Sequence, residues 1–474
     1  MTAPLPTPPP LSGGSAGPDA LRPLLDTVLD ALREGAAERG GPLPAGGPEA
    51  VAARVRAAAE PVLPEHGEGA HPVLHRLVRA VAQGAADPAD PRCAAHLHTP
   101  PLALAAAADL AVCALNPSMD SWDQAPAAAA LEETVTAALA AEIYPRAAAP
   151  AALVTTGGTE SNQLGLLLAR ERHGAVQTVC GSGAHHSVRR AAWLLGLPEP
   201  LALPTAHGGL DPAALDDALT RLPGPHLVVA TAGTTDTGRI DPLPEIADLC
   251  ARHRAELHID AAYGGALLFA GRHRALLAGL DRAHSITLDL HKLGWQPIAA
   301  GLFAVADRDR LAPLSLTADY LNAEDDTAAG LPDLLGRSLR TTRRPDILKI
   351  AVTLGALGRD GLAELIGRTL DAAQRFAGLI ERHPRLELWE RPQLSTVLFR
   401  PTGAGDEQIA AVRRTLLTEG RAVLGRTRAD GRLWLKATLL NPYTTPGDLR
   451  QLIELVEGST PDDRHAPRRI PPAP

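Results

Sequence analysis

The chain has 474 residues, 45% of them hydrophobic and 21% charged, and this length suits two or three structural units around a sizeable core. Its formal net charge of −8 argues against a nucleic-acid-binding protein, which normally carries a basic stripe. The four cysteines are widely spread and form no CxxC pair, so we expect free thiols in a reducing compartment and no metal site.

The N-terminal segment 1–18 is rich in Pro and Gly and shows no hydrophobic periodicity, so we expect it to be disordered. It lacks the positively charged start and the apolar core of a signal peptide. The longest apolar stretch of the chain, Leu102–Leu115, is interrupted by Asp109 and is too short to span a bilayer. The sequence therefore predicts a cytoplasmic protein that has neither a membrane nor a nucleic acid among its partners.

Residues 19–90 follow a helical pattern. Apolar side chains recur there at spacings of three and four, at Leu21, Leu24, Leu25, Val28 and Leu32. The stretch from Gly41 to Gly47 interrupts this pattern and predicts several short helices rather than one long one. The apolar faces of such helices need a surface to cover them.

From about Ala151, short apolar runs alternate with amphipathic stretches such as Pro244–His253. The runs are Ala152–Val154, Leu227–Ala230, Leu257–Ile259, Ile286–Leu288 and Gly301–Val305. This alternation predicts an α/β large domain, placed at 91–345, with a mainly parallel sheet that is covered on both faces. Because ligands bind beyond the carboxyl ends of such strands, the residues that follow each run are the candidates for a site.

A smaller α+β domain is expected at 346–460. Helical stretches are predicted at Ile347–Leu357, at Gly361–Ile380 and from Asp406 and Pro446, with strand-like runs at Thr396–Phe399 and Leu433–Thr438. The last residues, 461–474, are again Pro-rich and are expected to form a disordered tail.

A glycine-rich turn follows the first apolar run. In Thr156-Gly-Gly-Thr-Glu-Ser-Asn162 the turn opens a helix, whose backbone N–H groups and positive dipole end suit a phosphate group. Many such turns are only tight connections, and this one is neither a P-loop nor a dinucleotide fingerprint. His185 follows another apolar run, at a position where an imidazole either stacks on a planar cofactor or simply begins a helix.

Three further strand ends carry polar residues. Thr235 follows Leu227–Ala230 and suits a ligand or an ordinary turn. Asp260 ends a buried run, where a carboxylate either pairs with a protonated ring nitrogen or caps a helix. Lys292 lies beside His291 after Ile286–Leu288, and it is one of only three lysines in the chain. A desolvated lysine of this kind can attack an aldehyde, and the alternative is a surface lysine on a loop.

No single feature decides the chemistry, but their order along the chain does. It supplies a phosphate anchor, a ring face, a partner for a ring nitrogen and an amine that reacts with an aldehyde. Those are the contacts that pyridoxal 5'-phosphate (PLP) requires. The sequence therefore predicts PLP as the cofactor, held by Lys292 as a Schiff base.

These runs resemble the group II amino-acid decarboxylases, which are fold-type I PLP-dependent enzymes with an aspartate-aminotransferase-like fold. The matching runs are Thr156–Asn162, Ala184-His185, Gly233–Thr235, His258–Tyr263 and His291-Lys292. The resemblance covers about Pro91–Pro442. It implies a homodimer with the active site at the interface, in which the helical segment 19–90 wraps the partner.

The resemblance also implies a role for individual residues. The expected cofactor-binding residues are Gly158, Thr159, His185, Thr235, Asp260, Ala262, Asp289, His291 and Lys292. Among them, Gly158 and Thr159 hold the phosphate, His185 and Ala262 contact the two ring faces, and Asp289 stands where many relatives have Asn. The expected catalytic residues are Lys292, His185, Asp260, His291 and Tyr320. Tyr320 is a candidate proton donor, with a purely structural loop position as the alternative.

The expected substrate-binding residues are His98, Thr99, Asp120 and Arg343. Arg343, with Arg344 beside it, matches a family arginine that binds the substrate carboxylate. Asp120 stands where aromatic amino-acid decarboxylases carry an aromatic residue, and a carboxylate there, or at Asp123, suits a distal ammonium group. Turn capping by both aspartates is the alternative.

The runs around these residues look most like bacterial siderophore-pathway decarboxylases that act on lysine, ornithine or 2,4-diaminobutyrate. We therefore expect decarboxylation of an L-diamino acid to an amine and CO₂, in siderophore or polyamine biosynthesis. The alternatives are an aromatic amino-acid decarboxylase, a decarboxylation-coupled amine oxidase or aldehyde synthase, and a non-catalytic PLP-binding scaffold. A scaffold would have no need of the carboxylate clamp expected at Arg343.

Overall fold

The computed structural model of the chain describes residues 9–460. The predictions of disorder at 1–8 and 461–474 lie outside the described residues, and helix α1 begins at Gly17, inside the segment expected to be disordered. The chain divides into two compact units, one made of residues 9–21 and 97–368 and the other of residues 22–96 and 369–460. Among the described residues, no helix is both long enough and apolar enough to cross a membrane.

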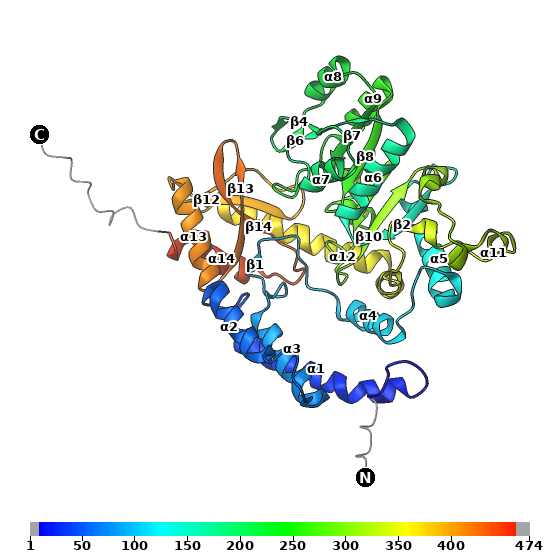
Figure 1. The fold of residues 1–474 in the computed structure, drawn as a ribbon. Coiled ribbons are helices and arrows are strands. Elements are labelled where there is room, and N and C mark those ends of the chain that lie inside the picture. The colour runs from blue at the N-terminus through cyan, green and yellow to red at the C-terminus, as the bar shows by residue number, and fades with distance from the viewer. Residues whose placement is uncertain (1–8, 461–474) are drawn as a thin grey trace, which may run out of the picture. The chain divides into compact units, whose positions relative to one another are not determined.

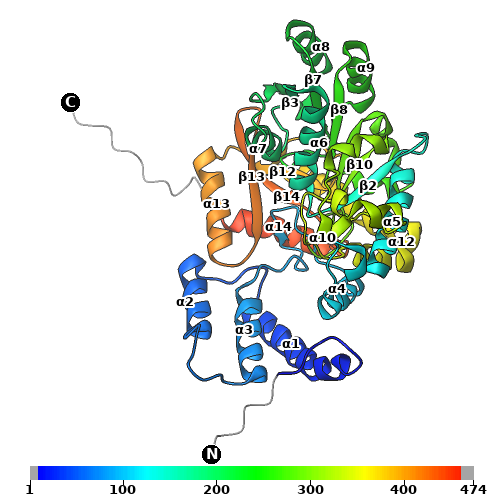
Figure 2. The same ribbon diagram turned by 45° about the vertical axis from the view of Figure 1, so that its right-hand side comes forward.

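The helices and strands are shown in Figures 1 and 2. The described α-helices are α1 (Gly17–Arg39), α2 (Gly47–Ala59), α3 (Ala70–Gly84), α4 (Ala103–Leu115), α5 (Pro126–Ile143), α6 (Gly158–His173), α7 (His186–Leu194), α8 (Pro212–Arg221), α9 (Leu243–His253), α10 (Asp319–Asn322), α11 (Glu324–Ala328), α12 (Ile347–Glu381), α13 (Asp406–Thr418) and α14 (Pro446–Gly458). The described strands are β1 (Cys93–Ala94), β2 (Ala151–Thr155), β3 (Gln177–Gly181), β4 (Leu201–Leu203), β5 (Thr205–Ala206), β6 (Gly209–Leu210), β7 (His226–Thr231), β8 (Glu256–Ala261), β9 (Ser285–Asp289), β10 (Gly301–Val305), β11 (Leu386–Leu388), β12 (Thr396–Pro401), β13 (Val423–Ala429) and β14 (Arg432–Thr438).

The first unit is built on a seven-stranded sheet with the order β2-β10-β9-β8-β7-β3-β4. Its pairs are parallel except those of β10, which runs antiparallel to both β2 and β9. The five apolar runs of the sequence form β2, β7, β8, β9 and β10, and every residue of β7, β8, β9 and β10 is buried. The prediction of a mainly parallel α/β large domain is therefore confirmed.

Helix α6 packs against β8, β9 and β10, and α7 packs beside it; Figure 1 shows α6 next to β8. Apolar residues of both helices meet side chains of β3 and β7 in one buried cluster, which includes Leu166, Val188, Cys180 and Val229. Because parallel strands share a direction, this packing brings the carboxyl ends of β7, β8 and β9 and the N-terminus of α6 to one edge of the sheet.

The second unit has a five-stranded sheet with the order β1-β13-β14-β12-β11. Helix α13 packs on β13 and β14, as Figure 2 shows, and the later part of α12 joins α13 and α14 in the core of this unit, for example through Phe376, Leu416 and Leu452. The expected interruption of the long helix occurs at Gly358, whose φ of 60° is non-helical.

The unit boundary differs from the expected boundary at 345/346, because it falls inside α12, between Arg368 and Thr369. The N-terminal helical region also belongs to this second unit and not to a segment of its own. Strand β1 explains this, since Cys93 and Ala94 pair in parallel with Val423 and Leu424 of β13. A two-residue strand carries too little periodicity to be predicted from the sequence.

Candidate active site

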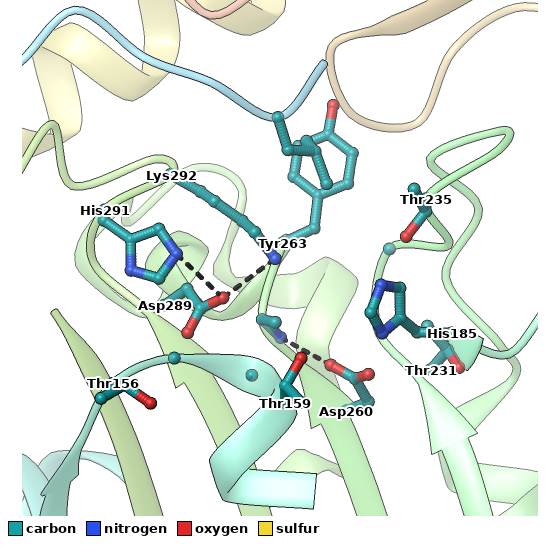
Figure 3. A pocket seen from close by; sticks show the side chains of 15 residues that line it. Thr156, Thr159, His185, Thr231, Thr235, Asp260, Tyr263, Asp289, His291 and Lys292 are labelled. Atoms are coloured by element: carbon teal, nitrogen blue, oxygen red, sulfur yellow. Dashed lines mark hydrogen bonds and ion pairs between the residues drawn. The ribbon is translucent and has the colours of Figure 1, made fainter. Parts of the chain in front are cut away.

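A cavity of about 280 Å³ opens at the carboxyl edge of the seven-stranded sheet. It is lined by residues that follow five different strands, together with Leu97 from the segment before α4: Leu97, Thr156, Gly157, Gly158, Thr159, His185, Thr231, Gly233, Thr235, Asp260, Ala262, Tyr263, Asp289, His291 and Lys292. Figure 3 shows Lys292, Asp260 and His185 around this cavity. The structure thus brings together all nine residues that the sequence predicts to bind the cofactor.

The glycine-rich turn before α6 forms one wall of the cavity. Gly157 has φ 147° and ψ −175°, a backbone conformation that residues with a side chain rarely adopt. A Cβ atom at Gly158 would lie 3.1 Å from Ala262 Cβ and 3.3 Å from Asp289 Oδ2. The turn is therefore a narrow cradle at a helix N-terminus, where free N–H groups and the helix dipole favour an anion.

Asp289 places a carboxylate beside this turn, where it adds negative charge. The Lys292 Nζ atom lies 3.0 Å from Asp289 Oδ2, and His291 Nε2 lies 3.4 Å from the same oxygen, as the dashed lines in Figure 3 mark. The Ala300 N–H donates to His291 Nδ1 at 3.3 Å, so in the neutral ring the proton is on Nε2 and faces Asp289. Burial lowers the pKa of His291 and so favours that neutral ring.

His185 caps the start of helix α7 and also lines the cavity, so its helix-starting interpretation is confirmed and stacking on a cofactor stays a prediction. The backbone N–H of Ser187 donates to His185 Nδ1 at 3.3 Å, which caps the helix. Burial lowers the pKa of His185, with the charge of Asp260 acting in the opposite direction. A neutral imidazole at this wall suits contact with the face of a planar ring.

Asp260 lies at the end of β8, next to its last residue, and its carboxylate is buried. It accepts hydrogen bonds from Asn162 Nδ2 at 2.8 Å and from the Ala262 N–H at 3.1 Å. The alternative of a helix N-cap does not hold, since the next helical turn begins only at Gly265. A buried carboxylate that lines a cavity favours a cationic group there.

Five of the expected site residues do not line the cavity, namely Arg343, Asp120, Tyr320, His98 and Thr99. The Arg343 guanidinium is buried and binds Glu132 through two hydrogen bonds, Nη1–Oε2 at 2.6 Å and Nη2–Oε1 at 2.8 Å. Asp120 accepts from Gln124 Nε2 at 2.7 Å, which is closer to the turn-capping alternative. Tyr320 is 82% exposed on α10, and His98 is exposed too. Within one copy of the chain these residues lie outside the cavity, and their expected roles stay predictions.

Two other predictions need adjustment. Thr99 also stays outside the cavity. Its hydroxyl donates to the backbone oxygen of His291 at 3.0 Å and so helps to fix the loop that carries His291. Asp123, the second candidate for an ammonium group, is exposed and accepts from Ser121 Oγ at 2.6 Å. The Thr99 contact is not visible in sequence spacing, because Thr99 and His291 are 192 residues apart, whereas the Asp123 contact is local and fits the turn-capping alternative.

Six lining residues were not among the predicted site residues: Leu97, Thr156, Gly157, Thr231, Gly233 and Tyr263. Four of them lie inside the runs that carry the family resemblance, so the sequence could have marked these four as site residues. Leu97 lies beside His98 in a run that carries the resemblance to the siderophore-pathway decarboxylases, but an aliphatic side chain there did not mark it as a site residue.

A family model described as "Pyridoxal-dependent decarboxylase conserved domain" matches residues 53–402, well over half of the chain. The chain belongs to this decarboxylase family. Its cofactor is accordingly PLP, and the residues that line the cavity fit that group: a glycine cradle for the phosphate, a carboxylate for the ring nitrogen and a lysine amine for the aldehyde. The prediction of a PLP-dependent decarboxylase is confirmed.

Two relatives of this decarboxylase match it over most of the length of both chains. It is 43% identical over 411 residues to "L-2,4-diaminobutyrate decarboxylase" of Rhizobium meliloti (strain 1021), a match that covers 83% of each chain. It is 32% identical over 430 residues to the protein of that name from Acinetobacter baumannii, covering 83% of this chain and 84% of the relative.

Solved structures show the same fold. The glutamate decarboxylase domain of diaminobutyrate-pyruvate transaminase and L-2,4-diaminobutyrate decarboxylase from Vibrio parahaemolyticus is 32% identical, with a TM-score of 0.84 over 95% of this chain and 97% of that one. The structure of Oryza sativa TDC with PLP and tryptamine is 23% identical, with a TM-score of 0.85 over 94% of this chain and 99% of that one, and supports the fold alone.

His258 gives the decarboxylase an acid-sensitive core. Burial lowers the pKa of His258 to about 4, against about 6.5 for an unperturbed imidazole. The native state therefore binds fewer protons than the unfolded chain between these values, so acidification from about pH 6.5 to about pH 4 lowers the free energy of unfolding by about 3 kcal/mol through this group alone. Urea unfolding of His258→Gln, in which no imidazole titrates, should show a shallower loss over that window. Equal slopes for the two proteins would contradict this prediction.

Proposed function

We propose that this decarboxylase acts on L-2,4-diaminobutyrate and releases CO₂ and 1,3-diaminopropane. The observation that carries the proposal is the meeting of Lys292, Asp260 and His185 at one cavity beside a phosphate-binding turn. The choice among diamino acids is supported by the names of the relatives at 43% and 32% identity. A role in siderophore or polyamine biosynthesis follows from the diamine product and is part of the same proposal.

The residues of the cavity would divide the work as follows. Bound PLP supplies an aldehyde that joins the substrate amine and an electron-poor ring that accepts the electrons of the breaking Cα–carboxylate bond. Lys292 holds the cofactor covalently, and Asp260 keeps the ring nitrogen protonated. His185 and Ala262 hold the ring between them. His291, whose Nε2 proton faces Asp289, would hold that carboxylate in place beside the phosphate-binding turn.

We also propose a cytoplasmic homodimer in which residues 19–90 contribute to the interface. Leu29, Leu32 and Val81 leave apolar surface of α1 and α3 exposed in the single chain, and a second copy would cover it. In that dimer, Asp120 would have to reach the cavity of the partner to meet a distal ammonium group, since it lies outside the cavity of its own chain. The expected roles of Tyr320 as proton donor and of His98 in binding substrate likewise require that these residues reach the cavity of the partner.

Steady-state turnover of 2,4-diaminobutyrate, ornithine, lysine and tyrosine tests the substrate. We expect kcat/KM to be highest for 2,4-diaminobutyrate and to fall by about tenfold or more with each methylene that the longer diamino acids add.

Asp120→Asn should lower kcat/KM for the diamino acids and leave tyrosine turnover unchanged, because only the diamino acids carry a distal ammonium group.

The products of the same assay separate the other functions. We expect the amine and CO₂ to be released in equal molar amounts. Faster turnover of tyrosine would favour an aromatic amino-acid decarboxylase, and H₂O₂ with aldehyde in place of the amine would favour a decarboxylation-coupled oxidase. Bound PLP without release of CO₂ from any substrate would indicate a scaffold and overturn the proposal.

A further inference from the structure

The side chain of Asn162, in the first turn of α6, lies behind the cavity and does not line it. It is fully buried, and each of its polar atoms has two partners. Asn162 Nδ2 donates to Asp260 Oδ2 at 2.8 Å and to Ser187 Oγ at 2.9 Å. Asn162 Oδ1 accepts from Thr287 Oγ1 at 2.8 Å and lies 3.0 Å from His258 Nε2.

The orientation of this amide follows from Asp260. An ionised carboxylate only accepts hydrogen bonds, so the Asn162 atom that faces it has to be the donor Nδ2. Oδ1 then requires a proton on His258 Nε2, which leaves His258 Nδ1 to accept from Ser285 Oγ at 2.8 Å. The low pKa of His258 agrees with such a neutral ring. Gly165 allows the close packing, because a Cβ atom there would lie 2.7 Å from His258 Nδ1.

A second line of hydrogen bonds leads from Asn162 to His185. Ser187 Oγ accepts from Asn162 Nδ2, so its own hydrogen is free to be donated to His185 Nδ1, 2.8 Å away. The Ser187 N–H donates to the same ring nitrogen. His185 Nδ1 is therefore an acceptor, and in the neutral ring the proton is on Nε2.

We infer that Asn162 is a positioning residue that holds Asp260 as an anion and, through Ser187, holds His185 in its Nε2-protonated form. A hydrogen bond donated to a carboxylate favours its charged state. A carboxylate held in this way keeps a ring nitrogen protonated, and the same amide orients the imidazole on the ring face. The inference rests on the proposed roles of Asp260 and His185 in the PLP holoenzyme.

The test is the ¹⁵N chemical shift of the ring nitrogen in holoenzyme loaded with ¹⁵N-labelled PLP, which reports directly whether that nitrogen is protonated. Asn162→Asp has nearly the same shape but replaces the donor by a second carboxylate, and Asn162→Ala removes the donor without adding charge. Asp260→Asn is the reference for a lost partner. Ser161→Ala is the matched control, since the neighbouring Ser161 is equally buried but bonds to Thr155 and the Leu302 carbonyl.

Both Asn162 variants should move the resonance toward that of the unprotonated ring nitrogen seen in Asp260→Asn, and Ser161→Ala should leave it in place. In the same proteins kcat should fall about tenfold or more, with KM changed less than about threefold, because Asn162 does not line the cavity. If Asp260→Asn moves the resonance and neither Asn162 variant does, the inference is wrong. If Asp260→Asn itself leaves the resonance unchanged, the role proposed for Asp260 fails and the inference fails with it.

Discussion

Replacing Lys292 with alanine is expected to abolish the visible absorption band that borohydride reduces and to lower decarboxylation by about 10³-fold or more. Lys292 Nζ is the only lysine amine that lines the cavity in the described part of the chain, and it sits 3.0 Å from Asp289 Oδ2. Lys349 is fully buried and binds Asp109 and Asp346 instead. Mass spectrometry after borohydride treatment checks the result, because the mass of the cofactor should be added to the wild type and not to the variant.

Lys292→Arg is the matched control for this experiment. Arginine retains a cation beside Asp289 but has no amine that can join the aldehyde. The variant should fold like the wild type, bind PLP without a borohydride-stable adduct and remain inactive. An adduct in Lys292→Ala would mean that another lysine holds the cofactor.

Replacing Glu132 with glutamine is expected to lower the free energy of unfolding by about 3–5 kcal/mol. The side chains of Glu132 and Arg343 are 2% and 1% exposed and are joined by two hydrogen bonds, so the substitution leaves a buried guanidinium without its counter-charge. Urea unfolding measures the loss. Glu133→Gln, one position along α5 and exposed, should change the same quantity by less than about 0.5 kcal/mol.

The double variant Glu132→Leu with Arg343→Met separates the structural role of Arg343 from the expected role in binding substrate. Removing both charges together costs less stability than removing one, because no fully buried ion is left unpaired; Arg337, whose Nε lies 3.8 Å from Glu132 Oε1, is 27% exposed. We expect this protein to fold, to bind PLP and to retain most of its kcat/KM. A well-folded double variant whose KM rises more than about tenfold would restore Arg343 as the carboxylate clamp.

The local sequence was sufficient for the parts of the site that lie at strand ends. Asp260, Lys292 and the turn at Gly157 each follow a short apolar run, and parallel strands bring such positions to one edge of the sheet whatever their distance in the chain. The same holds for the helix break at Gly358, since a glycine there interrupts a helical pattern on its own. Periodicity and turn chemistry are properties of neighbouring residues, so the sequence shows them directly.

Arg343 and Asn162 show what local pattern does not contain. Arg343 stands in a run typical of a substrate-binding arginine, but its partner Glu132 lies 211 residues earlier, on a helix with no motif. Asn162 was visible only as the end of the glycine-rich run, and its partners Ser187, His258, Asp260 and Thr287 lie 25 to 125 residues away.

By itself, therefore, the sequence determined the α/β fold, the PLP chemistry and Lys292 as the reactive amine, because each depends on short runs at strand ends. Only the tertiary structure decided that Arg343 is occupied by Glu132, that Asp120 and Tyr320 lie outside the cavity, and that one buried amide joins Asp260 to His185. Partnerships of buried polar groups depend on which side chains packing brings within about 3 Å of each other, and residue spacing along the chain does not encode that distance.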